Sequence, residues 1–303
     1  MDSLVTADAV GKRYGNFTAL SSVDFIIEPG ITGLLGANGT GKTTLLGMML
    51  GLHQVSAGQL RVLGVDPYTQ GHLIRARMGY APEHHTLPGD VKAADFVHHV
   101  AELHGLPPRE AKTRASDALW LVGLAEERFR PMGTMSTGQR QRVKLAQAIA
   151  HDPAVVLLDE PTDGLDPEQR DEMLRLIRTV ATSFGISVIL SSHLLDEVER
   201  ICDAAVIIGE GRTLAAGSLD ALRGSGADVV IDLESLDDVR TIVAALKQRS
   251  IPHSLDGRSV VVKGEDETAF DAARDVCAES SVSIRRLSRR RLSLEDVYLE
   301  RAS

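Results

Sequence analysis

One short segment restricts the possible folds of this chain more than any other. An apolar run over Ile31–Leu35 leads into a glycine-rich loop, and helical periodicity extends from Thr43 to Leu52. The loop satisfies the pattern G-x-x-x-x-G-K-[ST] and reads Gly36-Ala37-Asn38-Gly39-Thr40-Gly41-Lys42-Thr43. Glycines let backbone N–H groups approach phosphate oxygens, which also face the positive end of the following helix. Strand, loop and helix in this order predict a bound nucleoside triphosphate and disfavour a plain glycine-rich turn.

The polar residues of this segment, and two carboxylates further along, have defined chemical roles in such a site. Lys42 is expected to reach the β- and γ-phosphates, and Thr43 to hold Mg²⁺ through its hydroxyl. The apolar strand predicted over 155–158 ends in Asp159 and Glu160. Asp159 is placed to bind Mg²⁺ through water, and Glu160 to orient or deprotonate the attacking water. An acidic pair at a strand end is by itself more often a solvated loop, but the phosphate loop upstream favours the catalytic interpretation.

The order of elements predicts an α/β fold in two domains. Helical periodicity dominates residues 89–150, and strands alternate with helices over 154–208, which is typical of a parallel sheet covered by helices. A glycine- and serine-rich break follows at 223–226, and residues 228–287 read as β-α-β-α-β. We therefore predict a first domain over 1–223, with a helical subdomain at about 86–150, and a small C-terminal α/β domain over 224–303.

Composition excludes several classes of protein. Hydrophobic residues make up 43% of the 303 residues and charged residues 25%, which are values of an ordinary folded chain. The net charge is −9, from 33 basic and 42 acidic residues, so no basic field draws the chain to nucleic acid. Cys202 and Cys277 stand apart from each other and from any Cys/His cluster. They predict neither a disulfide nor a zinc site, and favour a reducing cytosol.

The sequence also indicates neither secretion nor insertion in a membrane. The opening MDSLVTADAV lacks the basic and apolar regions of a signal peptide. Apolar runs such as Ala154–Leu158 are far below the ~20 residues that a membrane-spanning helix requires. If the protein serves a membrane, we expect it to do so from outside the bilayer.

Three further motifs follow one another along the chain. Ser136-Thr137-Gly138-Gln139-Arg140-Gln141-Arg142 precedes the acidic strand, Gly164-Leu165-Asp166 follows it, and Ser192-His193 closes the next strand. Ser136 and Gln139 have capping-box spacing, so this helix N-terminus can offer hydroxyl and N–H groups to an anion. In this order the motifs resemble the signature motif, D-loop and switch histidine of ABC-type ATPases. The resemblance covers most of residues 1–220 and implies a P-loop NTPase fold with ATP and Mg²⁺ as cofactors.

The resemblance also implies a role for each motif residue. The catalytic residues it implies are Lys42, Glu160 and His193. The Mg²⁺ ligands it implies are Thr43, Asp159 and Glu83. The nucleotide contacts it implies are Tyr14, Gly36, Ala37, Asn38, Gly39, Thr40, Gly41, Lys42, Thr43, Thr44, Ser136, Thr137, Gly138, Gln139 and Asp166. Tyr14 resembles the aromatic residue that stacks on the adenine ring, although it would be equally at home as a core tyrosine.

Some positions depart from the common pattern of the family. Glu83 stands where many relatives have a glutamine that touches Mg²⁺ and the membrane partner, and its carboxylate adds negative charge near the γ-phosphate. Thr137 replaces the first glycine of the signature and Met135 the usual leucine, so phosphate contact should rest on Ser136 and Gly138. Glu83 and a Ser-Thr-Gly signature also occur in the drug-resistance and exporter branch of the family.

The C-terminal region adds two weaker observations. The segment 294–300, LEDVYLE, resembles a short closing motif of the same branch. The basic run 285–291, RRLSRRR, is typical of a solvated face, with contact to acidic lipid or to a partner subunit as the alternative, and we assign it no site.

These features predict the ATP-hydrolysing subunit of a membrane ABC transporter. The resemblance to the drug-resistance branch implies an exporter, as in multidrug efflux. The resemblance implies a separate membrane-spanning permease, a homodimer that forms head to tail with ATP bound, a peripheral place at the cytoplasmic face of the membrane, and no nucleic-acid partner. Closure of the dimer would let Ser136 and Gly138 of one chain contact the γ-phosphate held by the other.

Two alternatives belong to other functional classes. An ABC ATPase of DNA repair would insert a long coiled coil between Lys42 and Ser136, and a translation type would usually carry two phosphate loops, whereas this chain has neither feature. A regulatory module that holds ATP without turnover would usually lack the catalytic carboxylate, but Glu160 is present. Measuring ATP turnover with and without membrane extract separates these possibilities.

Overall fold

The computed structural model describes residues 3–84, 87–223, 228–264, 268–280, 282–289 and 293–302. The chain divides into two compact units, Met1–Leu222 together with Glu300–Ser303, and Arg223–Leu299. Each unit has its own core of buried apolar side chains. The glycine-serine break at 224–226, and residues 290 and 291 of the basic run, lie outside the described residues.

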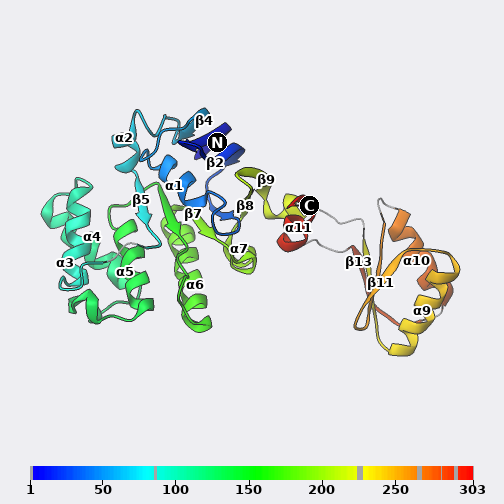
Figure 1. The fold of residues 1–303 in the computed structure, drawn as a ribbon. Coiled ribbons are helices and arrows are strands. Elements are labelled where there is room, and N and C mark those ends of the chain that lie inside the picture. The colour runs from blue at the N-terminus through cyan, green and yellow to red at the C-terminus, as the bar shows by residue number, and fades with distance from the viewer. Residues whose placement is uncertain are drawn as a thin grey trace. The chain divides into compact units, whose positions relative to one another are not determined.

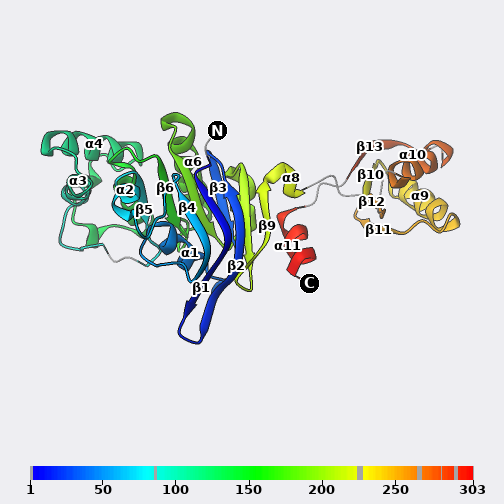
Figure 2. The ribbon, with the colours of Figure 1, turned by 90° about the horizontal axis from the view of Figure 1, so that it is seen from above.

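The first unit is built, within the described residues, on a nine-stranded sheet with the order β4-β1-β2-β9-β8-β3-β7-β6-β5 (Figure 2). Its strands are β1 (Val5–Tyr14), β2 (Phe17–Ile27), β3 (Ile31–Leu35), β4 (Ala57–Val62), β5 (Met78–Ala81), β6 (Val155–Asp159), β7 (Ser187–Ser192), β8 (Ala204–Gly209) and β9 (Arg212–Ser218). Strands β8, β3, β7, β6 and β5 run parallel to one another. Strands β4, β1 and β2 pair antiparallel at the other side of the sheet.

Burial explains why the central strands are mostly apolar. Every residue of β3, β6 and β7 is buried, because a parallel sheet is covered on both faces. The register places Leu35 beside Ser192 and Asp159 beside Ser191, so these three strands end at the same edge of the sheet. The phosphate loop, the acidic pair and the switch histidine follow these three ends and therefore meet at one edge.

Helices of the first unit flank this sheet (Figure 1). They are α1 (Lys42–Met49), α2 (Gly71–Arg75), α3 (Ala93–Leu103), α4 (Pro108–Leu121), α5 (Thr137–Ile149), α6 (Pro167–Phe184), α7 (Leu195–Ile201) and α8 (Leu219–Arg223). Helices α3, α4 and α5 pack together beside edge strand β5, within the region predicted to be helical. Throughout the described ranges, none of the helices has the length and apolar character needed to cross a membrane.

The second unit has the order β10 (Val229–Leu233), α9 (Leu236–Gln248), β11 (His253–Asp256), β12 (Ser259–Val262), α10 (Thr268–Ser280) and β13 (Ile284–Arg289), and α11 (Leu294–Ala302) follows. Its sheet is antiparallel with the order β11-β12-β10-β13, which is the split β-α-β or ferredoxin-like arrangement. Strand β11 is absent from the predicted β-α-β-α-β order. It forms a hairpin with β12 through a turn at Gly257, whose φ is +60°.

A stacked histidine pair lies between the helices α3 to α5 and the sheet. The rings of His104 and His151 are 3.6 Å apart and nearly parallel. Nε2 of His151 lies 3.1 Å from the carbonyl oxygen of Met78 and must donate to it, so Nδ1 is unprotonated. Nδ1 of His151 is buried without a hydrogen-bond partner in the described part of the chain. Burial, and then the charge of His104, lower the pKa of His151 to about 4.

This pair makes stability depend on pH. The pKa of His151 is lower in the folded state than its usual value of 6.5. Its contribution to the free energy of unfolding is therefore fully present above pH 6.5 and is lost as the pH falls towards about 4. Such a shift corresponds to about 3 kcal/mol across that interval. We expect thermal unfolding of the wild type to shift to lower temperature between pH 6.5 and pH 4, and His151→Gln to reduce that dependence. His72→Gln, at an exposed histidine of α2, is the control and should leave the dependence unchanged. An equal slope in wild type and His151→Gln would contradict the assignment.

Candidate nucleotide-binding site

The glycine-rich loop between β3 and α1 has close backbone packing that requires glycine. A Cβ built at Gly36 would lie 2.5 Å from the carbonyl oxygen of Ile208, and one at Gly41 would lie 2.9 Å from that of Ala19. Gly41 also has a φ of +104°, a conformation that other residues rarely adopt, and it is the N-cap of α1. The loop therefore presents the N-terminus of α1, with its free N–H groups, to the space above it.

Lys42 is held in place by the loop that it follows. The residue is only 6% exposed, and Nζ donates a hydrogen bond of 2.6 Å to the carbonyl oxygen of Gly36. Nζ also lies 3.4 Å from Oε1 of Glu160. The ammonium group thus lies between the loop and the acidic pair, where an entering phosphate would meet it.

A cavity of about 460 Å³ opens over this loop. Its lining combines the phosphate loop and the start of α1 with the carboxylates of Asp159, at the end of β6, and of Glu160, which follows it. The lining residues are Phe17, Ala19, Asn38, Gly39, Gly41, Lys42, Thr43, Thr44, Glu83, His84, Asp159 and Glu160. Of the predicted loop residues, Gly36, Ala37 and Thr40 do not line it, and the Thr40 hydroxyl instead donates to the carbonyl oxygen of Ala37.

Hydrogen bonds from β7 fix the acidic pair. The Ser191 hydroxyl donates to Oδ1 of Asp159 at 2.6 Å and accepts from the backbone N–H of Glu160 at 2.9 Å. Glu160 has a φ of +47°, which is unusual for a residue with a side chain and indicates a strained backbone at the carboxylate. Oε2 of Glu160 lies 2.9 Å from Nδ1 of His193. The sequence motifs after β6 and β7 therefore meet through their side chains.

One oxygen of Glu160 is left available. Glu160 is only 6% exposed, and Oε1 makes no hydrogen bond to any described residue, although the charge of Lys42 is close by. A buried acceptor without a partner is uncommon and is a place where a water molecule or a ligand can bind. The arrangement can therefore hold a water molecule next to a bound phosphate, with a carboxylate positioned to take its proton.

The oxygen atoms of the site fit the chemistry of Mg²⁺. This ion prefers hard oxygen ligands and is commonly bound through one or two carboxylates, a hydroxyl and the phosphates of the nucleotide. Thr43, Asp159 and Glu83 all line the same cavity and supply such oxygens. In the described ranges no group of three or more His, Cys, Asp and Glu side chains forms a metal site of its own. The oxygen donors that line the cavity therefore fit Mg²⁺.

The aromatic residues differ in their placement. Tyr14, at the end of β1, is 43% exposed and does not line the cavity. Its ring meets His53 edge-on at 5.9 Å, and Nζ of Lys12 lies 4.8 Å from its centre. Phe17, three residues along, lines the cavity and is exposed. The sequence analysis did not single out Phe17.

The predicted signature residues form a helix N-terminus outside this cavity. Ser136 is the N-cap of α5, where its hydroxyl accepts from the N–H of Gln139 at 3.2 Å and the Gln139 side chain accepts from the N–H of Ser136 at 3.1 Å. The capping box predicted from the spacing is therefore confirmed. Ser136, Thr137, Gly138 and Gln139 do not line the cavity over Lys42. Asp166 caps α6 in the same way, with Oδ1 accepting from the N–H of Gln169.

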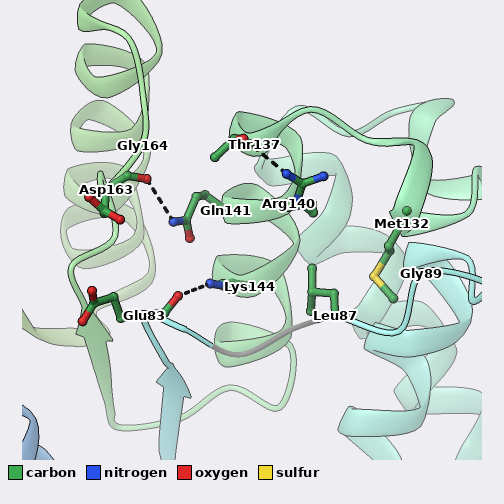
Figure 3. Close-up of a pocket in the computed structure, with 11 residues that line it drawn as sticks. Glu83, Leu87, Gly89, Met132, Thr137, Arg140, Gln141, Lys144, Asp163 and Gly164 are labelled. Carbon is green, nitrogen blue, oxygen red and sulfur yellow. Dashed lines mark hydrogen bonds between the residues drawn. The ribbon is translucent and has the colours of Figure 1, made fainter.

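A second cavity, of about 560 Å³, lies along α5 (Figure 3). One face of α5 points across it to the loops that contain Glu83 and Asp163. Lys144 donates to the carbonyl oxygen of Glu83 at 2.7 Å, and Gln141 to that of Asp163 at 3.4 Å. Burial lowers the pKa of Lys144. Lys144 and Gln141 were not among the predicted site residues, because each contacts a backbone carbonyl and no sequence pattern reveals such a contact.

Tyr80 is a further residue beside the site that sequence reasoning missed. Its pKa is raised to about 12, first by burial and then by the negative charges of Asp159 and Glu83. The side chain of Gln147 donates to the backbone carbonyl of Tyr80 at 2.6 Å, which attaches α5 to edge strand β5.

Known proteins resemble the chain in both sequence and fold. The sequence pattern of the ABC transporter family matches residues 20–163. The Nod factor export ATP-binding protein I of Ralstonia nicotianae is 32% identical over 276 residues, which cover 90% of this chain and 82% of that protein. The chain belongs to the ABC transporter family.

Further relatives of this ABC protein also match it over most of its length. The daunorubicin resistance ATP-binding protein DrrA3 of Streptomyces coeruleorubidus is 30% identical, over 98% of this chain and 95% of that protein. Among solved structures, cbiO1 of Clostridium perfringens, described as part of the ABC transporter complex cbiONQ, has a TM-score of 0.66. It is 27% identical and covers 72% of this chain and 89% of its own. The chain is thus an ABC-type ATPase, the ATP-binding subunit of a transporter, and its P-loop fold is the one predicted.

Proposed function

We propose that this ABC ATPase drives export through a separate membrane-spanning permease, with Glu160 as the residue that activates water. One observation supports the catalytic role above all. The Glu160 carboxylate is buried in the nucleotide cavity, 2.9 Å from His193 and 3.4 Å from Lys42, and still has one oxygen without a hydrogen bond among the described residues. A module that only holds ATP has no need for a strained, buried carboxylate at this position.

The proposed reaction uses groups that are already in place. The loop N–H groups and Lys42 hold the β- and γ-phosphates, and the other loop residues that line the cavity bind the rest of the nucleotide. Tyr14 would have to move towards the cavity to stack on the base, because it does not line the cavity in this structure. Oε1 of Glu160 accepts a proton from water as the water oxygen attacks the γ-phosphorus, and the bond to the ADP oxygen breaks. His193 holds Oε2 of Glu160 through Nδ1, and its other ring nitrogen would contact the γ-phosphate. Mg²⁺, held by Thr43, Asp159 and Glu83, would neutralise phosphate charge.

A second copy of the chain would complete the site. Ser136 and Gly138 stand at the N-terminus of α5, which can bind an anion, but they lie outside the cavity that holds Lys42. In a head-to-tail homodimer they would contact the γ-phosphate bound by the other chain. This arrangement gives the signature residues a ligand without moving them into their own cavity, and it makes closure depend on ATP.

The proposal of export rests on what the relatives do. One relative is described as a Nod factor export protein and another as a daunorubicin resistance protein, and they align with 90% and 98% of this chain. The cbiO1 structure belongs to a transporter complex. We therefore place the chain at the cytoplasmic face of the membrane, bound to a permease. Co-purification with a permease encoded by a neighbouring reading frame, with ATP turnover that changes on reconstitution, would support this placement. Unchanged turnover and no association would contradict it.

The domain division is also a proposal. We assign ATP binding to 1–223, with the helical subdomain at about 86–150, and an accessory role to 224–303. The two separate cores, and the position of every nucleotide-site motif in the first unit, support this division.

Ser136→Ala tests the proposed dimer. We expect ATP binding to the isolated monomer to change less than twofold, while hydrolysis falls at least about tenfold because the lost hydroxyl serves the other chain. Binding is measured by calorimetry and turnover by phosphate release. Ser235→Ala is a matched control, because Ser235 caps α9 of the second unit in the same way, through the N–H of Asp238. A large loss of monomer affinity in Ser136→Ala would contradict the head-to-tail arrangement.

A further inference from the structure

A buried carboxylate behind the catalytic pair has no role in the function described so far. Glu197 lies in the first turn of α7 and its exposed fraction is 0%. Oε2 accepts hydrogen bonds from the hydroxyls of Thr162 and Ser192, both at 2.9 Å. Oε1 lies 3.3 Å from Nε of Arg170, and neither of these two atoms makes a hydrogen bond to the described residues. Burying such a charge is costly unless its partners are well placed, so the presence of a buried carboxylate here needs a structural or functional explanation.

The two hydroxyls belong to the two catalytic loops. Thr162 comes two residues after Glu160 in the loop that follows β6, and Ser192 directly precedes His193 at the end of β7. Ser192 also accepts from the backbone N–H of Leu194 at 3.0 Å, so its hydroxyl holds the chain on both sides of His193. One carboxylate oxygen thus ties the two loops together behind the 2.9 Å contact between Glu160 and His193.

The strained backbone of Glu160 explains why this connection between the two loops is needed. Glu160 has a φ of +47°, and a conformation of this kind costs about 1–3 kcal/mol and persists only where the surroundings hold it. The Ser191 hydroxyl holds the N–H of Glu160 on one side of the residue. Glu197 holds Thr162 on the other side. The strained residue is therefore fastened before and after its Cα.

We propose that Glu197 is a positioning residue for ATP hydrolysis, which fixes Glu160 and His193 against each other by binding Thr162 and Ser192. The proposal rests on the proposed roles of Glu160 and His193. It assigns Glu197 no contact with nucleotide, because its carboxylate does not line the nucleotide cavity. Loss of Glu197 should thus change the rate of the chemical step and leave ATP binding unchanged.

Substitutions at Glu197 distinguish the effect of its hydrogen bonds to the two hydroxyls from the effect of its negative charge. Glu197→Ala removes both hydroxyl contacts and should lower kcat about 10- to 100-fold with the KM for ATP within about twofold, because a displacement of about 1 Å in a catalytic group has such an effect. Glu197→Gln keeps an oxygen that accepts from both hydroxyls and should restore most of kcat. Asp196→Ala, at the exposed neighbouring carboxylate of α7, is the matched control and should leave kcat unchanged.

A double substitution tests whether Glu197 acts through the catalytic pair. Glu160→Gln removes the carboxylate that Glu197 is proposed to position, so adding Glu197→Ala to it should cause little further loss of kcat. A purely structural lesion would instead multiply the two losses. Multiplied losses, or a KM that rises with no change in kcat, would overturn the proposal.

Two milder variants keep the proposal testable if Glu197→Ala does not fold. Thr162→Val and Ser192→Ala each remove one hydroxyl and should lower kcat severalfold, with circular dichroism reporting that the fold is kept. Wild-type kcat in both variants would overturn the proposal. If the wild-type protein itself shows no Mg-ATP hydrolysis, the proposed function fails, whereas wild-type turnover that Glu197→Ala leaves unchanged contradicts only the role of Glu197.

Discussion

Glu160→Gln is expected to lower ATP hydrolysis by at least about 100-fold while ATP binding is retained. The amide keeps the shape of the carboxylate and an oxygen for hydrogen bonding, but it cannot accept the proton of the attacking water. The contacts of Glu160 explain why binding should survive, since Lys42 keeps its bond to the carbonyl oxygen of Gly36. Phosphate release under saturating Mg-ATP measures turnover, and calorimetry measures binding.

The same variant should also reveal the dimer. Because bound ATP is no longer consumed, the closed dimer with two ATP molecules should accumulate. Gel filtration with Mg-ATP should then give a dimer for Glu160→Gln and mainly monomer for the wild type. Asp159→Asn is the comparison, because it should weaken the Mg²⁺ site and hence nucleotide binding itself. Hydrolysis by Glu160→Gln at the wild-type rate would contradict the role of Glu160 and leave Glu83 or His193 as the candidate base.

Continuous apolar runs made the central strands of the first unit predictable. The predicted strand 31–35 agrees with β3, and the predicted strand 155–158 agrees with β6 except that β6 also includes Asp159. Strand β5 was missed because Met78–Ala81 is short and contains a glycine, which reads as a turn. A Cβ at Gly79 would lie only 1.9 Å from the carbonyl oxygen of Ala148, so the glycine lets α5 pack closely against the strand.

The motif residues of the site were predictable for a different reason. Each motif is local in sequence, and the parallel order of β3, β7 and β6 brings their ends together. The residues that hold the motifs in place were not predictable, because their partners are distant in sequence. Ser191 bonds to residues 31 and 32 positions away, and Glu197 to Thr162, 35 positions away. The one sequence signal for these contacts was the pair Ser191-Ser192, which ends the otherwise apolar strand β7.

Lys42→Ala is expected to lower ATP affinity and turnover together, unlike Glu160→Gln. Charge-assisted hydrogen bonds of this kind contribute about 1.5–3 kcal/mol, so affinity should fall about 10- to 150-fold. Lys42 also lies 3.4 Å from Glu160, so its loss leaves a buried carboxylate without its cation and should disturb the site further. Lys112→Ala, at an exposed lysine of α4, is the control and should bind ATP as the wild type does.

The two substitutions can be combined to separate the two roles of Lys42. If part of the loss in Lys42→Ala arises from the unpaired Glu160 carboxylate, adding Glu160→Gln should restore some affinity for ATP, although turnover stays low. If Lys42 acts only on phosphate, the double variant should bind ATP as weakly as Lys42→Ala does. Calorimetry with ATP on the single and double variants distinguishes these outcomes. Unchanged affinity in Lys42→Ala itself would mean that the loop over 36–43 is not the phosphate site, because no other part of this loop supplies a cation.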